Sequence, residues 1–199
     1  GVIQPHENLA LLRYQIPTAF PENVMQEAIS IGKKAQNFNY DSLLDQTPLL
    51  TFTIDDVHTM DIDDALSVEI IDEHAIRVFV HISDVSYFID TESSLDQEAL
   101  KRGTSVYLPD RKIAMFPPQL SEGMMSLFPE NIRPVLTFEI LFNQNADVLE
   151  KQIYQSKIRV DYKLDYTGAT QIIDQLPESP IYKPLNTLFS LARKLKEKR

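Results

Sequence analysis

The feature that most constrains this chain is a run of acidic residues between two apolar segments. Five aspartates fall within ten consecutive residues: Asp55, Asp56, Asp61, Asp63 and Asp64. Segments 49–54 and 65–71 have the composition of buried strands, so the carboxylates are predicted to lie where strands meet a loop. Like charges held this close raise one another's pKa values unless a cation lies between them. A hard divalent ion such as Mg2+ or Mn2+ is the natural counter-ion, because it prefers carboxylate oxygens.

An acidic cluster does not by itself define a metal site. Most acidic runs are solvated loops or helix N-termini. In this run, apolar side chains alternate with the acids, which is not typical of a solvated loop and indicates that part of the segment is buried. These apolar residues are Ile54, Met60, Ile62, Ala65 and Leu66. An EF-hand is excluded, because position 6 counted from Asp61 is Leu66 instead of glycine and position 12 is Asp72 instead of glutamate. A haloacid-dehalogenase site would need a threonine four residues after Asp61, and this sequence has Ala65 there. The Asp-x-Asp pattern of glycosyltransferases stays open, because Asp61-Ile-Asp63 fits it.

Composition excludes several classes of protein. The chain has 199 residues, enough for one domain with a sizeable core. Cysteine is absent, which excludes thiolate chemistry and thiolate zinc sites and favours a cytoplasmic protein. No apolar run is long enough to span a membrane, and we expect no signal peptide. The four histidines show no metal-ligand spacing.

The charge distribution is unfavourable for nucleic-acid binding over most of the chain. The formal net charge is −10, and phosphate contacts dominate the affinity of nucleic-acid complexes. Residues 183–199 hold six basic residues and one acid, so they carry +5 and residues 1–182 carry −15. A solvated helix face explains the basic end. The sequence ends without a glycine or proline stop signal, so we expect the chain to end within an element.

Four helices are predicted from periodicity and end signals. A helix is expected over 21–35, because proline opens it and apolar residues recur at helical spacing. A capping-box pattern at Ser94 and a stop at Gly103 delimit a second helix. The pattern turns helical again near 169–176 and from Asn186 to the end.

Strands outnumber these helices and include hairpins. Apolar alternation predicts a hairpin over 65–82 and paired strands at 135–142 and 148–158. Segment 104–118 holds three prolines and is predicted to be an ordered loop, while 37–48 is a polar connector. The expected fold class is therefore α+β, with a mixed or antiparallel sheet and packed helices.

The hairpin places His81 near the acidic loop, where it and Asp84 would be able to point toward a metal. An ordinary half-buried strand histidine is the simpler interpretation, and we prefer it.

Several segments, in order along the chain, resemble the ribonuclease II/R (RNB) family. The acidic run 53–66 is similar to the signature of that family. The other matching segments are 80–86 (VHISDVS), 95–99 (LDQEA), 102–109 (RGTSVYLP), 120–127 (LSEGMMSL), Arg133 with the strand after it, 156–159, and 20–24 (FPENV). Several motifs in the right order are far more specific than one Asp-x-Asp, and the resemblance covers nearly the whole chain.

The resemblance implies hydrolytic 3′→5′ degradation of single-stranded RNA to nucleoside 5′-monophosphates, with two divalent ions at the site. The ligands implied by motif position are Asp55, Asp61, Asp63 and Asp64, which would hold Mg2+ or Mn2+. We expect Asp63 to be essential for catalysis, and we leave out Asp56 because it falls at a variable family position. Tyr107 matches the aromatic residue on which the family stacks a terminal base. A loop tyrosine that packs on the core is the alternative for Tyr107.

The resemblance implies further parts, namely OB-fold RNA-binding barrels on both sides of the catalytic domain and a catalytic arginine segment beyond Arg199. We expect these parts to lie outside this sequence. We predict a leading helix and connector, 1–48, and the N-terminal part of an RNB-like catalytic domain, 49–199, incomplete at its C-terminus.

We expect this chain to bind a divalent ion without degrading RNA by itself. A phosphoryl group needs cationic donors, and the nearest ones by motif, Arg102, Arg111 and Arg133, are all open to a structural role. Two other functions stay open. One is a non-catalytic RNB-like module that binds RNA or metal, and the other is a nucleotide-sugar transferase that uses Asp61 and Asp63.

Overall fold

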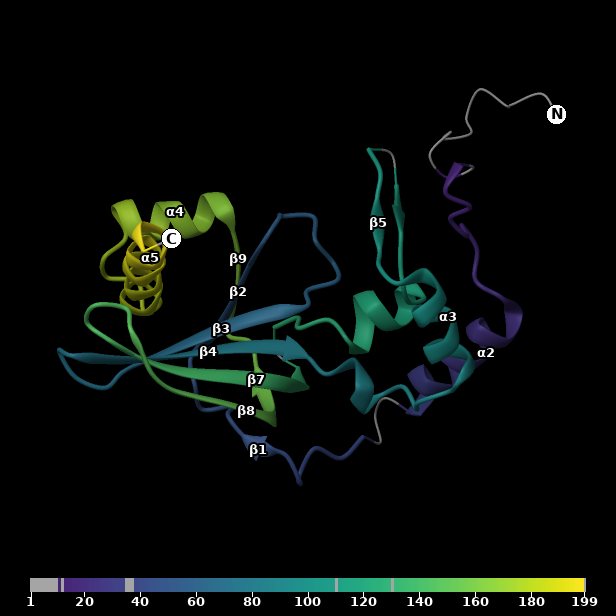
Figure 1. Cartoon of the computed structure of the whole chain (residues 1–199), viewed down its shortest axis with the longest axis horizontal. Helices are drawn as coiled ribbons and strands as arrows, with labels where there is room; N and C mark the ends of the chain where they lie inside the picture. Colours follow the sequence, from purple (N-terminus) through teal and green to yellow (C-terminus); the bar gives the residue numbers. More distant parts are fainter. Residues whose placement is uncertain (1–10, 12, 35–37, 110, 130, 199) are drawn as a thin grey trace.

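The computed structural model of the chain describes residues 11, 13–34, 38–109, 111–129 and 131–198. The strands of the main sheet gather on one side with α4 and α5 above them, and α2 and α3 lie at the opposite end of the molecule, next to the β5 hairpin (Figure 1). The elements are α2 (Glu22–Lys34), β1 (Leu44–Asp45), β2 (Thr51–Asp55), β3 (Asp64–Ile70), β4 (Ala75–Ser83), η2 (Val85–Tyr87), α3 (Ser94–Arg102), β5 (Val106–Tyr107), β6 (Lys112–Ile113), η3 (Leu120–Met124), β7 (Ile132–Asn143), β8 (Val148–Arg159), β9 (Tyr162–Asp165), α4 (Tyr166–Gln175) and α5 (Tyr182–Glu197).

The main sheet has seven strands in the order β1-β8-β7-β4-β3-β2-β9. The central pairs β2–β3, β3–β4, β4–β7 and β7–β8 are antiparallel, whereas β1 runs parallel to β8 and β9 runs parallel to β2. The predicted hairpin over 65–82 is confirmed, since β3 and β4 pair from Asp64 opposite Ile82 to Ile70 opposite Ile76. The predicted α+β class with a mixed sheet is confirmed as well.

Helices α4 and α5 cover one face of this sheet. Phe52 of β2 packs with Ala169 of α4 and Leu185 of α5 in one buried cluster. Val78, Phe142 and Leu191 belong to a second cluster under α5. Leu188 contacts both clusters, which joins the two helices to the strands through a continuous apolar layer. No helix in the described part of the chain is long and apolar enough to cross a membrane.

Both of these helices begin earlier than predicted. α4 begins at Tyr166 instead of residue 169, because the Asp165 carboxylate at the end of β9 accepts a hydrogen bond from the Gly168 N–H at 2.6 Å and caps the helix. α5 begins at Tyr182 instead of Asn186. Pro184 lies in its first turn, where the missing N–H has no helical partner to lose.

At the opposite end, the two predicted helices α2 and α3 pack against each other. Val24, Ala28 and Ile31 of α2 are buried in a cluster with Leu95 of α3 and Leu120 of η3. α3 ends at Gly103, which has a φ of 72°, as the stop signal predicted.

The cap of α3 lies one residue earlier than predicted. Ser93, not Ser94, is the N-cap, and its Oγ accepts from the Asp96 N–H at 3.2 Å. The two neighbouring serines give the same capping pattern in both registers, so sequence alone does not separate them.

Two segments without predicted elements contain short strands. The predicted loop 104–118 holds the hairpin β5–β6, in which Val106 pairs with Ile113 and Tyr107 with Lys112. The Leu108 N–H donates to the Arg111 carbonyl at 2.9 Å and closes the turn. Strand β1, in the predicted connector, adds to the edge of β8. Strands of two residues are too short to produce a periodic signal.

Candidate active site

Strands β2 and β3 place two of the aspartates at neighbouring strand ends inside the sheet. β2 ends at Asp55 and its antiparallel neighbour β3 begins at Asp64, so the two carboxylates lie where the pair of strands opens. The chain between them forms a loop over 56–63. The Asp63 carbonyl accepts from the Ser83 N–H at 2.8 Å, which ties the end of this loop to β4.

The loop is anchored through Ile62, whose side chain is fully buried. The Ile62 N–H donates to Ser126 Oγ at 3.0 Å, and the Ser126 hydroxyl donates to the Met60 carbonyl at 2.8 Å. Because neighbouring side chains alternate in an extended chain, burial of Ile62 turns Asp61 and Asp63 the other way. The anchor therefore directs two acids into a common space.

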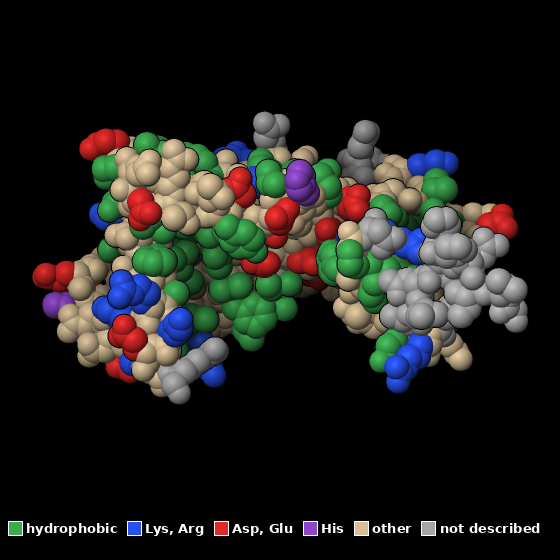
Figure 2. Space-filling model, turned by 90° about the horizontal axis from the view of Figure 1, so that it is seen from above, with side chains coloured by type: hydrophobic (Ala, Val, Ile, Leu, Met, Phe, Trp, Pro, Cys, Tyr) green, Lys and Arg blue, Asp and Glu red, His purple; other side chains and the backbone are tan. Residues whose placement is uncertain are grey.

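That space is a cavity of about 520 Å3. Its lining residues are Asp55, Asp56, His58, Thr59, Met60, Asp61, Asp63, Asp64, Tyr107, Lys112 and Glu122. Acidic side chains gather in the middle of the face shown in Figure 2. The four predicted metal ligands, Asp55, Asp61, Asp63 and Asp64, thus line one cavity together with Tyr107.

The carboxylates of the cavity influence one another electrostatically. Burial, followed by the negative charge of Asp64, raises the pKa of Asp55, and Lys163 opposes this shift. Burial, followed by the charge of Asp61, raises the pKa of Asp63, and Lys112 opposes that shift. Such crowding favours a bound cation, because a cation stabilises the ionised form of every carboxylate around it.

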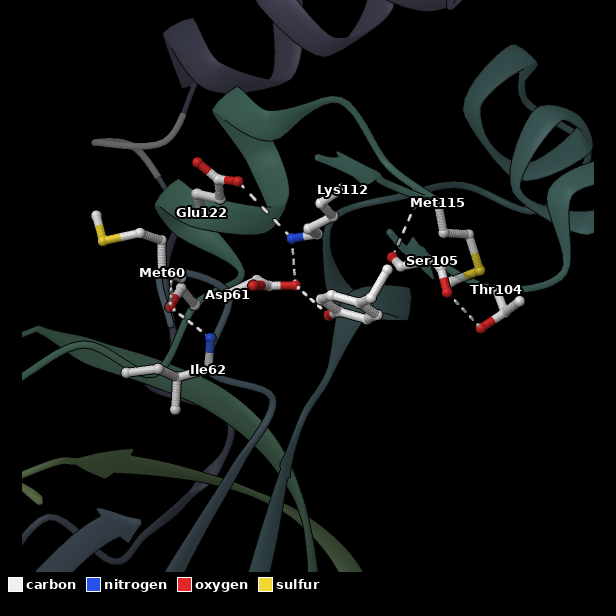
Figure 3. A network of polar contacts seen from close by, with 10 residues as sticks. Met60, Asp61, Ile62, Thr104, Ser105, Lys112, Met115 and Glu122 are labelled. Atoms are coloured by element: carbon white, nitrogen blue, oxygen red, sulfur yellow. Dashed lines mark hydrogen bonds and ion pairs between the residues drawn. The ribbon is translucent and has the colours of Figure 1, made fainter. Parts of the chain in front are cut away.

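Two residues of the β5–β6 hairpin contact Asp61. The Lys112 ammonium forms an ion pair with Asp61 Oδ2 and lies 3.7 Å from Glu122 Oε1. Figure 3 shows Lys112 between these two carboxylates. The Tyr107 hydroxyl donates to the same Asp61 oxygen at 3.1 Å.

Tyr107 has an exposed ring and a hydroxyl that is tied to the site. Its side chain is 69% exposed, so the alternative of a tyrosine packed on the core is wrong. Burial of the hydroxyl and the neighbouring charge of Asp61 raise the pKa of Tyr107 to about 12. The Tyr107 hydroxyl therefore stays protonated at physiological pH. The residue lines the acidic cavity.

The donor set of the cavity fits a hard divalent ion in its chemistry. Every predicted ligand offers carboxylate oxygens, which Mg2+ and Mn2+ prefer. Within the described residues, however, no three acidic or histidine side chains converge closely enough to hold an ion as they are placed. Asp61 is turned toward Lys112 and Tyr107 instead. Both partners use Asp61 Oδ2, so a cation that binds this oxygen would have to displace them.

Other candidates from the sequence lie away from the cavity. His81 is fully buried between Ser67 Oγ, 3.1 Å from its Nε2, and Thr137 Oγ1, 2.8 Å from its Nδ1. Asp84 is buried and accepts from Ser86 Oγ and Gln155 Nε2. The suggestion that His81 and Asp84 point toward a metal is therefore wrong, and the histidine is more deeply buried than we predicted.

The arginines considered as phosphate donors do not line the cavity either. Arg102 pairs with Glu98 at 2.8 Å, donates to three backbone carbonyls and lies over the Phe20 ring. Arg133 donates to the backbone of η3 and of the segment after it. These contacts give both residues a structural role.

Sequence reasoning missed Lys112, Glu122 and Ser126. The hairpin β5–β6 supplies the signal for Lys112, because a turn over 108–111 places residue 112 directly across from Tyr107. Pro109-Asp110 is a turn dipeptide that would have allowed this prediction. Glu122 and Ser126 come close only through the fold, so no local pattern reveals them.

The fold and the cavity define an α+β protein with an oxygen-rich acidic site at the ends of two neighbouring strands of a mixed sheet. The model of the RNB domain matches residues 44–199. Ribonuclease R of Aquifex aeolicus is 33% identical over 197 residues, which cover 96% of this chain and 28% of the relative. The chain belongs to the RNB domain family.

Two further comparisons bear on function. Two Arabidopsis thaliana proteins, named DIS3-like exonuclease 2 and Inactive exonuclease DIS3L2, are each 48% identical over 132 residues, which cover 65% of this chain and 12% of each relative. The structure of Mycoplasma genitalium RNase R in complex with ribose-methylated single-stranded RNA matches with a TM-score of 0.84 at 25% identity, over 94% of this chain and 30% of that one. The chain thus spans less than a third of the length of these relatives.

Proposed function

We propose that this chain carries the acidic half of a 3′→5′ exoribonuclease site, which hydrolyses single-stranded RNA and releases nucleoside 5′-monophosphates. The observation that carries the proposal is one cavity in which Asp55, Asp61, Asp63 and Asp64 lie beside the exposed ring of Tyr107. Family membership and the Ribonuclease R relatives support the reaction class. The RNA-bound structure of the Mycoplasma genitalium enzyme supports RNA as the substrate.

The four aspartates are the proposed ligands of Mg2+ or Mn2+. When bound, such ions activate water and neutralise charge that develops on a phosphoryl group. The chain's own contribution is positioning: Ile62 and Ser126 hold the loop so that Asp61 and Asp63 face the cavity. Burial, and after it the charge of the neighbouring carboxylates, raises the pKa values of Asp55 and Asp63, and a bound cation would offset both effects.

Tyr107 is the proposed platform for the base at the RNA 3′ end. Its hydroxyl is held by Asp61 while most of its side chain is open to solvent, so a base is able to stack on the ring beside the acids. Stacking on an aromatic side chain tolerates any base, because every base presents a π-face. This arrangement suits an enzyme that removes nucleotides without reading their sequence.

The chain alone is proposed to bind metal without efficient hydrolysis. Among the described residues that line the cavity, Lys112 is the one Lys or Arg, and its ammonium is paired with Asp61. Preorganised positive charge around a transferring phosphoryl group is commonly a large part of catalysis. Further cationic donors must therefore complete the site.

A chimaera tests the proposal. Residues 44–199 would replace the matching segment of the Aquifex aeolicus Ribonuclease R, and release of mononucleotides from 3′-labelled single-stranded RNA would be measured with Mg2+. Asp63→Asn should lower this rate by at least about a hundredfold. Mutation of a residue that only hydrogen-bonds to a metal ligand already costs about 10- to 100-fold in metal affinity or activity, and loss of the ligand itself should cost more. RNA binding should hardly change, since the ligand serves the transition state. Asp56→Asn, in the same cavity but outside the proposed ligand set, is the matched control.

Two results would contradict this function. A folded chimaera that binds RNA and releases no mononucleotide would favour a non-catalytic RNB-like module. That second candidate is supported by the Asp61–Lys112 pair, which occupies a proposed ligand, and by the 48% identical relative named as an inactive exonuclease. An Asp63→Asn chimaera that works within tenfold of its parent would instead show that the acids are misassigned.

A further inference from the structure

We propose that Lys112 is a placeholder for the divalent cation at Asp61: its ammonium group competes with the ion for that carboxylate and so sets the ion concentration at which the acidic cavity is loaded. This inference rests on the metal site of the proposed function. Neither the family match nor the relatives assign any role to Lys112.

The pair is shielded from water on both sides. The Lys112 side chain is 19% exposed and that of Asp61 is 11% exposed. Attraction between opposite charges grows as the surrounding dielectric falls, so this contact is stronger than an ordinary surface pair. The ammonium nitrogen itself is buried. Lys112 therefore behaves as a fixed cation of the cavity wall, in contrast to a mobile surface lysine.

The backbone holds Lys112 in this place. It lies on β6 directly across from Tyr107 on β5, and the Tyr107 hydroxyl donates to the same Asp61 oxygen that pairs with the ammonium. At the base of the hairpin, the Met115 N–H donates to Ser105 Oγ at 3.0 Å (Figure 3). The register of the hairpin thus delivers a cation and a hydroxyl to one carboxylate oxygen.

Lys112 and Tyr107 both use Asp61 Oδ2. Mg2+ binds carboxylate oxygen at about 2.0–2.1 Å, so an ion on Oδ2 has to displace the ammonium group, and an ion on Oδ1 of the same carboxylate is repelled by it. In either position the Lys112 ammonium group opposes binding of the ion. Competition of this kind is reciprocal, so the free energy that the pair contributes in the absence of the ion is subtracted from the affinity for the ion.

Glu122 offers the displaced ammonium a second partner. Its Oε1 is already 3.7 Å from the Lys112 Nζ, on the other side from Asp61. Lys163, which also affects the acids, differs because its ammonium donates to the Thr59 carbonyl at 2.9 Å. Among these two lysines, Lys112 is the one whose position conflicts with a cation on Asp61.

The test is a Mn2+ titration of the whole chain, followed by calorimetry, with Lys112→Met compared to the parent. Lys112→Met should bind Mn2+ about tenfold more tightly, as expected for the removal of a competing ion pair that is largely withdrawn from water. In the absence of metal the same variant should melt at a lower temperature, and Mn2+ should raise its melting temperature by more than that of the parent. Lys101→Met, which removes the same charge from the exposed surface of α3, should match the parent.

Two further variants keep the test decisive if Lys112→Met does not fold. Glu122→Gln removes the second partner of the ammonium and should weaken Mn2+ binding about threefold, because displacement of Lys112 then costs more. Lys112→Arg keeps the competing cation and should not tighten binding.

The failures of the two proposals are distinguishable. Equal affinity of parent and Lys112→Met, or weaker binding by Lys112→Met, would overturn the placeholder role and leave the metal site standing. Unchanged affinity in Glu122→Gln would likewise overturn the placeholder role if Lys112→Met is unfolded. No Mn2+ binding by the parent or by any folded variant would overturn the metal site, and the placeholder with it.

Discussion

The Ile62 N–H donates to the Ser126 hydroxyl at 3.0 Å, across 64 residues of sequence. Both side chains are fully buried, and the same hydroxyl donates to the Met60 carbonyl at 2.8 Å. One serine therefore satisfies two backbone groups of the acidic loop, one of which is the N–H of the fully buried Ile62. Buried polar groups are costly when unpaired, so this contact fixes the path of the chain between Asp61 and Asp63.

Ser126→Ala should destabilise the fold and loosen the acidic loop. Loss of the hydroxyl leaves the Ile62 N–H and the Met60 carbonyl without their partner, and a buried unsatisfied group costs about 1–3 kcal/mol. We expect the free energy of unfolding in urea to fall by about 2 kcal/mol. Ser121→Ala is the matched control, because the Ser121 Oγ is buried without a hydrogen-bond partner among the described residues. Equal losses in both variants would show that the Ser126 contacts contribute nothing specific.

His81 should make the fold sensitive to acid. Burial lowers the pKa of His81 to about 4, whereas an unfolded histidine titrates near 6.5. Its direct partners are two hydroxyls, of Ser67 and Thr137, and its ring stacks on Phe79. As the pH falls below 6.5, the unfolded chain gains a proton that the folded chain does not bind. The contribution of His81 is therefore complete above pH 6.5 and is lost progressively down to about pH 4.

Urea unfolding at pH 7 and pH 5 measures this loss. One proton taken up only by the unfolded chain costs about 1.4 kcal/mol per pH unit. Between pH 6.5 and pH 5 the parent should lose about 2 kcal/mol more than His81→Gln, which cannot be protonated in this range. His74→Gln, at an exposed turn, should behave like the parent. The same pH dependence in the parent and in His81→Gln would assign the acid sensitivity to other groups.

Local patterns predicted the elements whose side chains follow a regular period. The stripe of Val24, Ala28 and Ile31 identified α2, because all three side chains are buried in one cluster.

The alternation along 76–82 identified β4 as a strand, but the burial of β4 does not alternate. Phe79 and His81 are buried, whereas Ile82 is exposed. The acidic run was located correctly, because Asp55 and Asp64 end and begin strands whose composition is plain in the sequence.

Contacts made only by the fold were not predictable. A turn signal places Lys112 across from Tyr107, but no local signal indicates that Lys112 meets Asp61 across 51 positions or that Ser126 meets Ile62 across 64. His81 shows the reverse error. A histidine on the strand face opposite to the apolar stripe seemed half exposed, but Ser67 and Thr137 from neighbouring strands bury it in a polar layer. Such a layer becomes visible only when the strand order is known.

Tyr107 should contribute to RNA binding through its ring more than through its hydroxyl. Stacking is worth about 1–3 kcal/mol per base, and 1.4 kcal/mol is tenfold in affinity. Tyr107→Ala should therefore weaken binding of a labelled short single-stranded RNA, followed by fluorescence anisotropy with Mn2+, by about tenfold or more. Tyr107→Phe keeps the ring and loses the bond to Asp61, so it should stay within about threefold of the parent. Equal weakening by both variants would assign the role to the hydroxyl, and no change in either would remove Tyr107 from the RNA site.

In the absence of metal, the negative charge of Asp63 should destabilise the fold. Burial and the neighbouring carboxylates raise the pKa of Asp63, which means that its charge is less favourable in the folded chain than in the unfolded one. This penalty is present above the folded pKa and disappears as the pH falls through it. Asp63→Asn removes the charge, so at neutral pH with a chelator it should raise the free energy of unfolding. Because the residue as a whole is exposed and its carboxyl group is only partly withdrawn from water, solvent screens the charge and the gain should be only about 0.5 kcal/mol.

Addition of Mn2+ should reverse this order. A ligand at a hundred times its dissociation constant stabilises the folded state by about 2.7 kcal/mol, which exceeds the small gain of the variant. The parent should then be more stable than Asp63→Asn, and thermal melts with chelator and with Mn2+ measure both comparisons. Asp174→Asn, an exposed position on α4, controls for the change of net charge. A parent that remains less stable than Asp63→Asn at saturating Mn2+ would show that the charge of Asp63 does not serve a bound cation.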